Sequence, residues 1–384
     1  MTDPVPDPGT DVALYVHWPY CARICPYCDF NVVRDRGRTD EQAALADAIV
    51  ADMEAQAALL GPRRLASIFF GGGTPSLMPT DQVARVIERA RALFPNGGQV
   101  EITLEANPTD AEAARFAALA KAGVSRLSLG VQSLDDEALR FLGRNHSAAE
   151  AMRALELARA AFARLSIDLI YARPGQTLAH WTQELNRAVD LGFEHISPYQ
   201  LTIEPTTAFG RAFARGTLVP PDEDLAADLY EATQTVLEAR GFDAYEVSNH
   251  ARDEAARSTH NLHVWRGGDY VGVGPGAHGR LTLDGARTAT VAHRGIADYL
   301  AGVGAGQPWS EDQQLSPPEA DEERLLLGLR TVEGVDAGLI EAMGLTPRAD
   351  ALSDQGLLVE SGGRIAATAH GRQVLDGVLR ALLV

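Results

Sequence analysis

The chain has 384 residues, of which 46% are hydrophobic and 22% are charged, and these proportions exclude disordered, collagen-like and coiled-coil proteins. Its 34 basic and 52 acidic side chains give a net charge of −18, which argues against binding of nucleic acid through a broad basic face. No apolar run approaches the roughly 18 residues of a membrane span. The acidic, proline-rich start resembles neither a signal peptide nor a transit peptide, so we expect a cytoplasmic protein.

Strand and helix patterns alternate through the first 200 residues, after an N-terminus expected to be flexible over residues 1–11. Six short, mostly apolar runs predict strands at residues 12–17, 66–70, 100–105, 126–131, 165–170 and 195–201. Helical patterns separate these runs at a spacing of about 30 residues, which is typical of consecutive βα units and predicts a parallel sheet. An incomplete (β/α)6 barrel and an open doubly wound sheet both fit this α/β pattern.

Polar residues gather where the predicted strands end. They comprise the cysteine loop after the first strand, Gly71–Pro75 (GGGTP) after the second, Glu105 at the end of the third, Gln132 after the fourth and Asp168 in the fifth. In parallel α/β folds, the carboxyl ends of the strands carry the functional site. We therefore expect these residues to surround one site.

The pattern changes after about residue 205. It predicts a helix at 222–240, a polar loop at 250–263, a glycine-rich stretch at 267–279, a hairpin with Asp284 and Gly285 at its turn, and a linker at 302–318. The end of the chain predicts three helices, a hairpin that turns near residues 361–363, and a final helix. This order is typical of a small winged-helix-like α+β domain. The expected division is a core over 12–240, an extension over 241–305 and a C-terminal domain over 306–384.

The cysteine arrangement is the most specific motif. The three cysteines, Cys21, Cys25 and Cys28, lie within eight residues, which excludes a disulfide framework. Three thiolates can hold three irons of a [4Fe–4S] cluster and leave the fourth iron open to another ligand. Zinc is the alternative, and it needs a fourth protein ligand, which His17 could supply.

Further residues around the cysteines carry a family resemblance. Tyr27 precedes the last cysteine, and residues 14–21 (LYVHWPYC) and 28–31 (CDFN) flank the motif. These strings resemble the radical S-adenosylmethionine (SAM) superfamily, and within it the family of the oxygen-independent coproporphyrinogen III oxidase HemN and the heme chaperone HemW. The resemblance implies a (β/α)6 partial barrel and SAM bound to the open iron of a [4Fe–4S] cluster. One electron from that cluster then cleaves SAM to methionine and a 5′-deoxyadenosyl radical.

The resemblance also implies which residues contact SAM: Tyr15, Gly72, Gly73, Thr74, Glu105, Gln132, Arg144 and Asp168. The planar fork of Arg144 suits a carboxylate. Gln132 and Asp168 suit ribose hydroxyl groups, and the glycines allow close backbone approach. Taken singly, Arg144 could instead form a surface salt bridge, and Asp168 could end a strand.

Two departures separate the chain from the oxidase. Phe30 occupies the position at which HemN has a fourth cysteine, and only 20 residues precede Cys21, fewer than in HemN. Both differences favour the heme chaperone and argue against coproporphyrinogen oxidation.

A later segment, residues 260–265 (HNLHVW), resembles the HNxxYW signature associated with heme in that family, with Val264 in place of tyrosine. Imidazole is a common axial ligand of heme iron, so His260 is the candidate heme contact, and Trp265 offers a flat face to a porphyrin. His263, His250 and His278 are the competing ligands.

The expected function is a heme chaperone that delivers heme to client hemoproteins, carrying a [4Fe–4S] cluster and SAM. We expect no nucleic acid partner and no transmembrane segment, with transient membrane contact and oligomeric state left open. The alternatives are a radical SAM coproporphyrinogen III dehydrogenase and a binding module structured by zinc.

Overall fold

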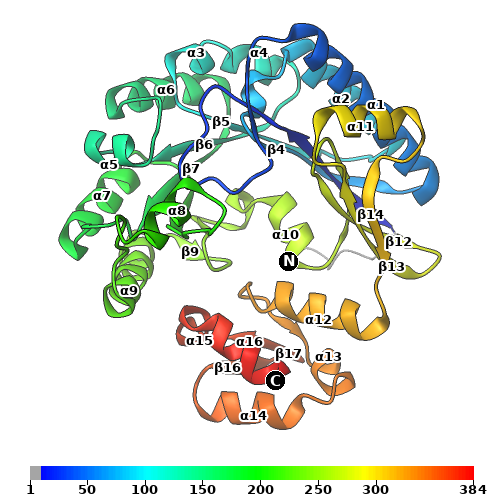
Figure 1. The fold of residues 1–384 in the computed structure, drawn as a ribbon. Helices are drawn as coiled ribbons and strands as arrows, with labels where there is room; N and C mark the ends of the chain where they lie inside the picture. The colour runs from blue at the N-terminus through cyan, green and yellow to red at the C-terminus, as the bar shows by residue number, and fades with distance from the viewer. Residues whose placement is uncertain (1–9) are drawn as a thin grey trace.

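The computed structural model describes residues 10–384, and its core is a curved parallel sheet (Figure 1). The six predicted strands are confirmed to within two residues at either end: β1 (Asp11–Trp18), β4 (Arg64–Gly72), β5 (Glu101–Ala106), β6 (Arg126–Gln132), β7 (Arg164–Tyr171) and β8 (His195–Gln200). They pair in parallel in this order. The (β/α)6 partial barrel is therefore confirmed. β1 begins at Asp11, inside the segment expected to be flexible, and residues 1–9 of that segment lie outside the described residues.

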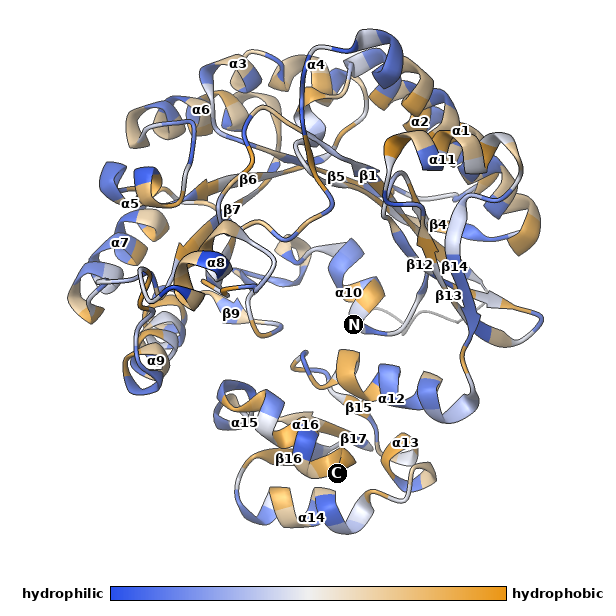
Figure 2. Ribbon diagram, in the orientation of Figure 1, coloured by the Kyte–Doolittle hydropathy of each residue, from blue (hydrophilic) through white to orange (hydrophobic). Residues whose placement is uncertain are grey.

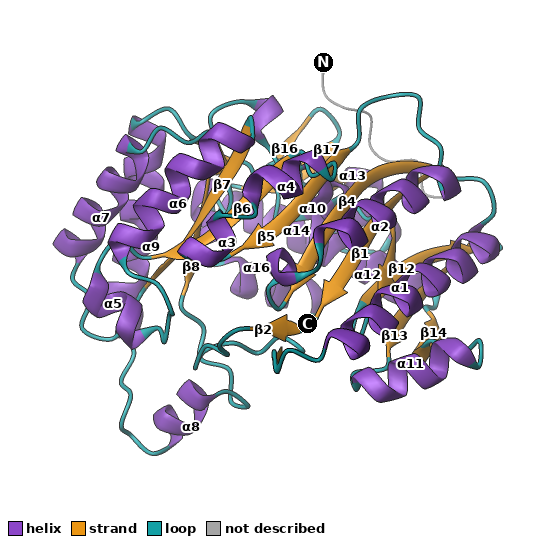
Figure 3. Cartoon of the chain, turned by 90° about the horizontal axis from the view of Figure 1, so that it is seen from above, coloured by secondary structure: helices purple, strands orange, loops and turns teal. Residues whose placement is uncertain are grey.

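Helices cover the outer face of this sheet (Figures 1 and 3): α1 (Thr39–Leu60), α2 (Thr80–Leu93), α3 (Asp110–Ala113), α4 (Phe116–Lys121), α5 (Asp136–Phe141), α6 (Ala148–Ala161), α7 (Leu178–Asp190) and α9 (Glu223–Ala239). Several begin at residues whose side chains cap the first turn, such as Ser147, Thr177 and Asp222. Orange hydrophobic and blue hydrophilic residues alternate along these helices in Figure 2, as expected for helices that bury one face. The other face of the sheet is left to the functional site.

The sheet extends beyond the barrel strands to twelve strands in the described part of the chain. β11 (Asp269–Val273) pairs in parallel with the outer side of β1, and β12 (His278–Leu283), β13 (Ala286–Ala292) and β14 (Trp309–Gln314) follow in antiparallel order. The predicted turn between β12 and β13 is confirmed, because Asp284 and Gly285 have φ angles of 51° and 79°. At the opposite edge lie β10 (His250–Ala251) and β9 (Asp243–Ala244).

Two expectations for the second half were wrong. The expected linker at 302–318 contains the end of α11 (Ile296–Gly304) and the whole of β14, so the main sheet continues to residue 314. The expected polar loop at 250–263 contains β10, a 3-10 turn at Glu254–Ala256 and most of α10 (Thr259–Trp265). β14 was missed because its sequence, WSEDQQ, is polar, and α10 because it has only seven residues.

The C-terminal domain has its own hydrophobic core, and the winged-helix-like order is confirmed, except that two helices rather than one follow the hairpin. Its elements are α12 (Pro317–Gly328), β15 (Val335–Asp336), α13 (Ala337–Ala342), α14 (Thr346–Asp354), β16 (Leu358–Ser361), β17 (Arg364–Ala367), α15 (Ala369–Gln373) and α16 (Leu375–Leu383). Arg266 binds Glu333 with two hydrogen bonds of 2.8 and 2.6 Å, which joins this domain to α10. No helix in the described residues is both long and apolar enough to cross a membrane.

A buried hydrogen-bonded group joins α1 and α11 to the end of β11. Tyr299 on α11 donates its hydroxyl proton to Asp52 on α1 at 2.7 Å, and its oxygen accepts the amide of Gly274 at 2.9 Å. Asp52 also accepts from Gln56, which reaches the carbonyl of Gly272 at the end of β11. Burial raises the pKa of Asp52 to about 6. The group therefore fixes the segment after β11 against α1.

We predict that Tyr299→Phe lowers the free energy of unfolding by about 1–3 kcal/mol, because Asp52 and the Gly274 amide each lose a buried partner. Urea denaturation followed by circular dichroism measures the change. Tyr230→Phe is the matched control, because the Tyr230 hydroxyl forms no hydrogen bond within residues 10–384. Equal stability of Tyr299→Phe and the parent would contradict the assigned role.

Candidate functional site

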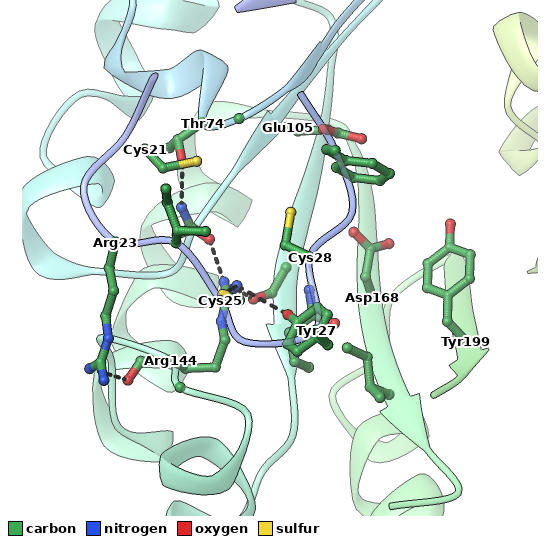
Figure 4. Close-up of a pocket in the computed structure, with 18 of the residues that line it drawn as sticks. Cys21, Arg23, Cys25, Tyr27, Cys28, Thr74, Glu105, Arg144, Asp168 and Tyr199 are labelled. Atoms are coloured by element: carbon green, nitrogen blue, oxygen red, sulfur yellow. Dashed lines mark hydrogen bonds between the residues drawn. The ribbon is translucent and has the colours of Figure 1, made fainter. Parts of the chain in front are cut away.

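A cavity of about 470 Å³ opens at the carboxyl ends of β4 to β8, against the cysteine loop. Figure 4 shows the three cysteines on one side of it and Glu105, Asp168 and Tyr199 on the other. It is lined by nearly all of the residues predicted to hold a cluster and SAM: Cys21, Cys25, Cys28, Gly72, Gly73, Thr74, Glu105, Gln132, Arg144 and Asp168. Tyr15 is the exception, and its position is described below. We call this space the cysteine cavity.

The cysteine loop is held by short strands and turns. Cys21 ends β2 (Tyr20–Cys21), which pairs with β3 (Val33–Arg34), and the amide of Cys28 donates to the carbonyl of Cys25 at 3.2 Å. α8 (Ala208–Ala214) projects beyond the strand ends (Figure 3), and its Phe209 amide donates to the carbonyl of Pro26 at 2.9 Å. The loop is thus braced on both sides.

The three thiols suit a polynuclear cluster better than a single zinc ion. Burial raises the pKa of Cys21 to about 12 and also raises that of Cys28, so both need a strong positive charge to ionise. In residues 10–384, no three side chains of His, Cys, Asp or Glu are grouped closely enough to hold one metal ion. All three cysteines nevertheless face one cavity large enough for a cluster and a further ligand.

His17, the candidate fourth zinc ligand, has no free ring nitrogen. Its Nε2 lies 2.8 Å from the carbonyl oxygen of Asn31, and its Nδ1 lies 3.1 Å from the hydroxyl of Tyr15. Since a carbonyl only accepts, Nε2 carries the proton, and Nδ1 accepts from Tyr15. The zinc alternative therefore loses its fourth ligand.

The glycine loop after β4 requires glycine at positions 72 and 73, because a side chain at either position would collide with neighbouring atoms. Gly72 has a φ of 104°, and a Cβ there would lie 2.6 Å from the ring of His17. A Cβ on Gly73 would lie 2.7 Å from the carbonyl oxygen of Pro19, while its amide donates to Trp18 at 2.8 Å. The next residue, Thr74, is buried, and its amide donates to the carbonyl of Tyr20. The loop therefore packs directly against the start of the cysteine loop.

Arg144 links the cysteine loop to the strand ends. Its guanidinium lies 3.3 Å from the Cys25 sulfur and donates to the carbonyl of Gly130 at 2.9 Å. It also donates to the amide oxygen of Asn107, whose nitrogen donates to Thr74 at 3.1 Å. Asn107 was not predicted, although it directly follows the polar end of β5. Its contacts make it the bridge between Arg144 and the glycine loop.

Four polar side chains of the strands face the cavity: Glu105, Ser128, Gln132 and Asp168. Gln132 has a φ of 66°, which is unusual for a residue other than glycine, and its Oε1 is buried without a hydrogen-bond partner in the described residues. Ser128 lies 3.2 Å from both oxygens of Asp168. Burial raises the pKa of Asp168 to about 6 and that of Glu105 to about 8, and the nearby Asp168 carboxylate raises the pKa of Glu105 further. These groups suit the hydroxyl groups and amines of a polar ligand.

We predict that replacing any one of Cys21, Cys25 and Cys28 by alanine removes most of the iron and sulfide bound after anaerobic reconstitution, because each thiolate would hold one iron. Chemical iron and sulfide analysis measures the loss. Arg91→Gln, on the outer helix α2, serves as the control and should keep the parental content. Full cluster content in all three cysteine variants would disprove the assignment.

A second prediction concerns pH. Because the pKa of Glu105 in the folded protein, about 8, exceeds its ordinary value of 4.5, ionisation of this group destabilises the fold as pH rises through that interval. Glu105→Gln should therefore gain thermal stability relative to the parent between about pH 5 and about pH 8. Tm measured without SAM tests this, with the exposed Glu238→Gln as control. A pH-independent difference would contradict it.

A second cavity, of about 620 Å³, lies beside the first on the inner face of the sheet. Asp29 and Phe30 of the cysteine loop line both cavities. The structure places Tyr15 and His17 here, on the inner face of β1, rather than among the residues that line the cysteine cavity. Aromatic residues give this space its character: Tyr15, Phe30, Phe69, Trp265 and Tyr270. We call it the aromatic cavity.

His260 lies at the inner end of the aromatic cavity, on α10 (Figure 1). It is only 6% exposed, its ring centre lies 5.0 Å from that of Phe69, and its Nδ1 lies 2.9 Å from the hydroxyl of Ser67 on β4. Burial lowers its pKa to about 3, so the imidazole is neutral at physiological pH. Ser67 was not predicted, since a buried serine inside a strand gives no functional signal.

The other candidate histidines are placed differently. His263 lies 2.7 Å from the carbonyl oxygen of Asp269, and His250 lies 3.0 Å from the amide oxygen of Gln234, and neither lines the aromatic cavity. His278 does line it, at the start of β12. Val264, which stands in place of the family tyrosine, and Trp265 line it too. Most residues of the segment around His260 therefore line the aromatic cavity, whereas His263 does not.

Comparison with known families gives two matches. The model of the radical SAM superfamily matches residues 15–188, which include the second half of β1, the three cysteines and the strand-end residues from Gly72 to Asp168. The model of the HemN C-terminal domain matches residues 315–374, which agrees with a main sheet that continues to residue 314.

Curated relatives match nearly the whole chain. The radical S-adenosyl methionine domain-containing protein 1, mitochondrial, from Mus musculus is 40% identical over 98% of this chain and 88% of its own length. The heme chaperone HemW from Escherichia coli is 36% identical over 97% of this chain and 98% of its own. HemW from Mycobacterium tuberculosis is also 36% identical, over 98% and 96%.

Among solved structures, coproporphyrinogen III oxidase HemN from Escherichia coli superposes with a TM-score of 0.80, covering 98% of this chain and 91% of its own. Its 22% sequence identity makes this a likeness of fold. Superfamily membership implies a [4Fe–4S] cluster and SAM, which fits the residues around the cysteine cavity. The chain belongs to the radical SAM superfamily and, within it, to the family that contains the heme chaperone HemW.

Proposed function

We propose that this protein is a heme chaperone that binds heme in the aromatic cavity and delivers it to client hemoproteins. The radical SAM core would hold a [4Fe–4S] cluster on Cys21, Cys25 and Cys28, with SAM in the cysteine cavity. Two kinds of support agree: the bacterial relatives named heme chaperone HemW, and the chemistry of the aromatic cavity. The cytoplasmic location and the client hemoproteins belong to the same proposal.

The position of His260 is the observation that carries the proposal. Ser67 engages Nδ1, and no hydrogen bond among residues 10–384 engages Nε2. In the tautomer in which Nδ1 donates its proton to the Ser67 hydroxyl, the neutral imidazole presents its Nε2 lone pair, which is the usual arrangement of a metal-binding histidine. The cavity volume of about 620 Å³ lies within the usual range for cofactor pockets, roughly 300–1,000 Å³. Aromatic walls suit the flat, apolar faces of a porphyrin.

In the cysteine cavity, we assign SAM contacts by chemistry. The Arg144 guanidinium pairs with a carboxylate, Gln132 and Asp168 bind ribose hydroxyl groups, and the backbone of Gly72 and Gly73 approaches an amino group. Glu105 adds a polar anchor. The bound cluster would supply one-electron reduction of the SAM sulfonium. The Tyr15 contact predicted from the family stays a prediction, since Tyr15 lines the neighbouring aromatic cavity.

A coproporphyrinogen III dehydrogenase is the alternative that the experiment must exclude. The structural likeness to HemN concerns the fold. Phe30, at the position of the oxidase's additional cysteine, is 61% exposed and stands between the two cavities. A side chain that cannot bind iron or transfer a proton therefore occupies the wall that faces both sites. We expect no conversion of coproporphyrinogen III by the reconstituted protein with SAM and a reductant.

We predict that His260→Ala shifts the absorption spectrum of bound heme and weakens heme binding, because the iron loses its axial nitrogen. Optical titration with heme measures both effects. His370→Ala, an exposed histidine on α15, is the matched control, and Cys21→Ala should keep most heme binding because the thiols line the other cavity. A His260→Ala protein with parental spectrum and affinity, or formation of protoporphyrinogen by the parent, would overturn the proposal.

A further inference from the structure

The aromatic cavity has two chemically different ends. Its inner end is formed by Phe69, Tyr15 and the buried His260. Its outer rim carries four exposed polar residues from β12, β14 and the loop after β13: His278, Arg294, Ser310 and Glu311. From β4, beside His260, to β12 the sheet crosses three strand spacings, about 14 Å. The cavity is therefore aromatic and closed at one end, and charged and open at the other.

Arg294 is an arginine of this rim whose guanidinium is available to bind an anion. It forms no ion pair with residues 10–384, whereas the nearby Arg280 and Arg287 both bind Glu323. Its backbone is fixed, because its carbonyl oxygen accepts a hydrogen bond of 2.9 Å from the side chain of Asn31. An exposed arginine whose backbone is held in place and whose guanidinium forms no ion pair among the described residues, at the mouth of a cavity in a chain of net charge −18, is a candidate anion contact.

We propose that this rim binds the carboxylate groups of a tetrapyrrole, with Arg294 as the principal contact. The inference rests on heme binding in the aromatic cavity and adds the orientation of the bound molecule. The propionate edge would lie at the rim, where a guanidinium can pair with both oxygens of a carboxylate. The apolar edge would lie against the stacked rings of Phe69 and Tyr15, on the side of the cavity that holds His260.

Removal of Glu311 is expected to change heme affinity in the opposite direction to removal of Arg294. Glu311 lines the same rim and forms no ion pair among the described residues. Together with Arg294 and Arg280, it lies close enough to His278 to influence the pKa of that histidine. Partial burial and the two arginines lower the pKa of His278, whereas Glu311 opposes that shift. A carboxylate at this position repels a propionate, so its removal should strengthen binding while removal of Arg294 should weaken it.

The test compares heme with its dimethyl ester, in which both propionates are neutral, in one detergent-containing buffer. The parent should bind the ester roughly three- to tenfold more weakly than heme. Arg294→Gln should weaken heme binding by a similar factor and leave ester binding unchanged. Glu311→Gln should strengthen heme binding alone. Arg91→Gln, an exposed arginine on the outer helix α2 that lines neither cavity, is the matched control and should change neither.

Equal affinity of the parent for heme and ester would overturn the inference, as would an equal loss of both ligands in Arg294→Gln, which would indicate a structural effect. These outcomes are separate from failure of the proposed function. If His260→Ala alters the heme spectrum while the ester binds as tightly as heme, the chaperone proposal stands and the orientation is wrong. If His260→Ala leaves the spectrum unchanged, His260 is not the axial ligand, and the proposed function loses the observation that carries it.

Discussion

The parallel pairing of β1 with β4 on one side and with β11 on the other is the constraint on which both cavities depend. Most residues of β1 are fully buried, so the strand cannot move without disrupting the core. Its end leads into the cysteine loop, and its inner face places Tyr15 and His17 in the aromatic cavity. One buried strand therefore fixes the position of the cysteines relative to the aromatic cavity.

His17 extends this constraint to the loops. It donates to Asn31 of the cysteine loop, accepts from Tyr15, and occupies the space that a side chain on Gly72 would fill. Burial lowers its pKa, which keeps the ring neutral and preserves this pattern of donor and acceptor. Asn31 in turn donates to the carbonyl oxygens of Pro275 and Arg294. The glycine loop, the cysteine loop and the rim of the aromatic cavity are thus joined through a single imidazole.

The parallel core and most of the cysteine cavity could be predicted from the sequence, because strands buried on both faces are continuous apolar runs and their polar ends must meet at one edge. The pairing of β11 with β1 could not be predicted from the sequence. β11 lies in a glycine-rich stretch more than 250 residues along the chain and carries no distinct apolar run. Without that pairing, nothing in the sequence indicates that Tyr15 faces a second cavity. The amide bridge at Asn107 and the serine at Ser67 likewise depend on long-range contacts.

The wall formed by Asp29 and Phe30 has a thermodynamic consequence. Both residues line both cavities, so a molecule that moves this wall when it fills one cavity changes the shape of the other. The resulting coupling free energy must be the same in both directions. Any increase in SAM affinity brought about by a bound porphyrin is then matched by an equal increase in porphyrin affinity brought about by SAM. If the aromatic cavity binds a porphyrin as proposed, binding of SAM in one cavity and release of the porphyrin from the other would be linked through one equilibrium.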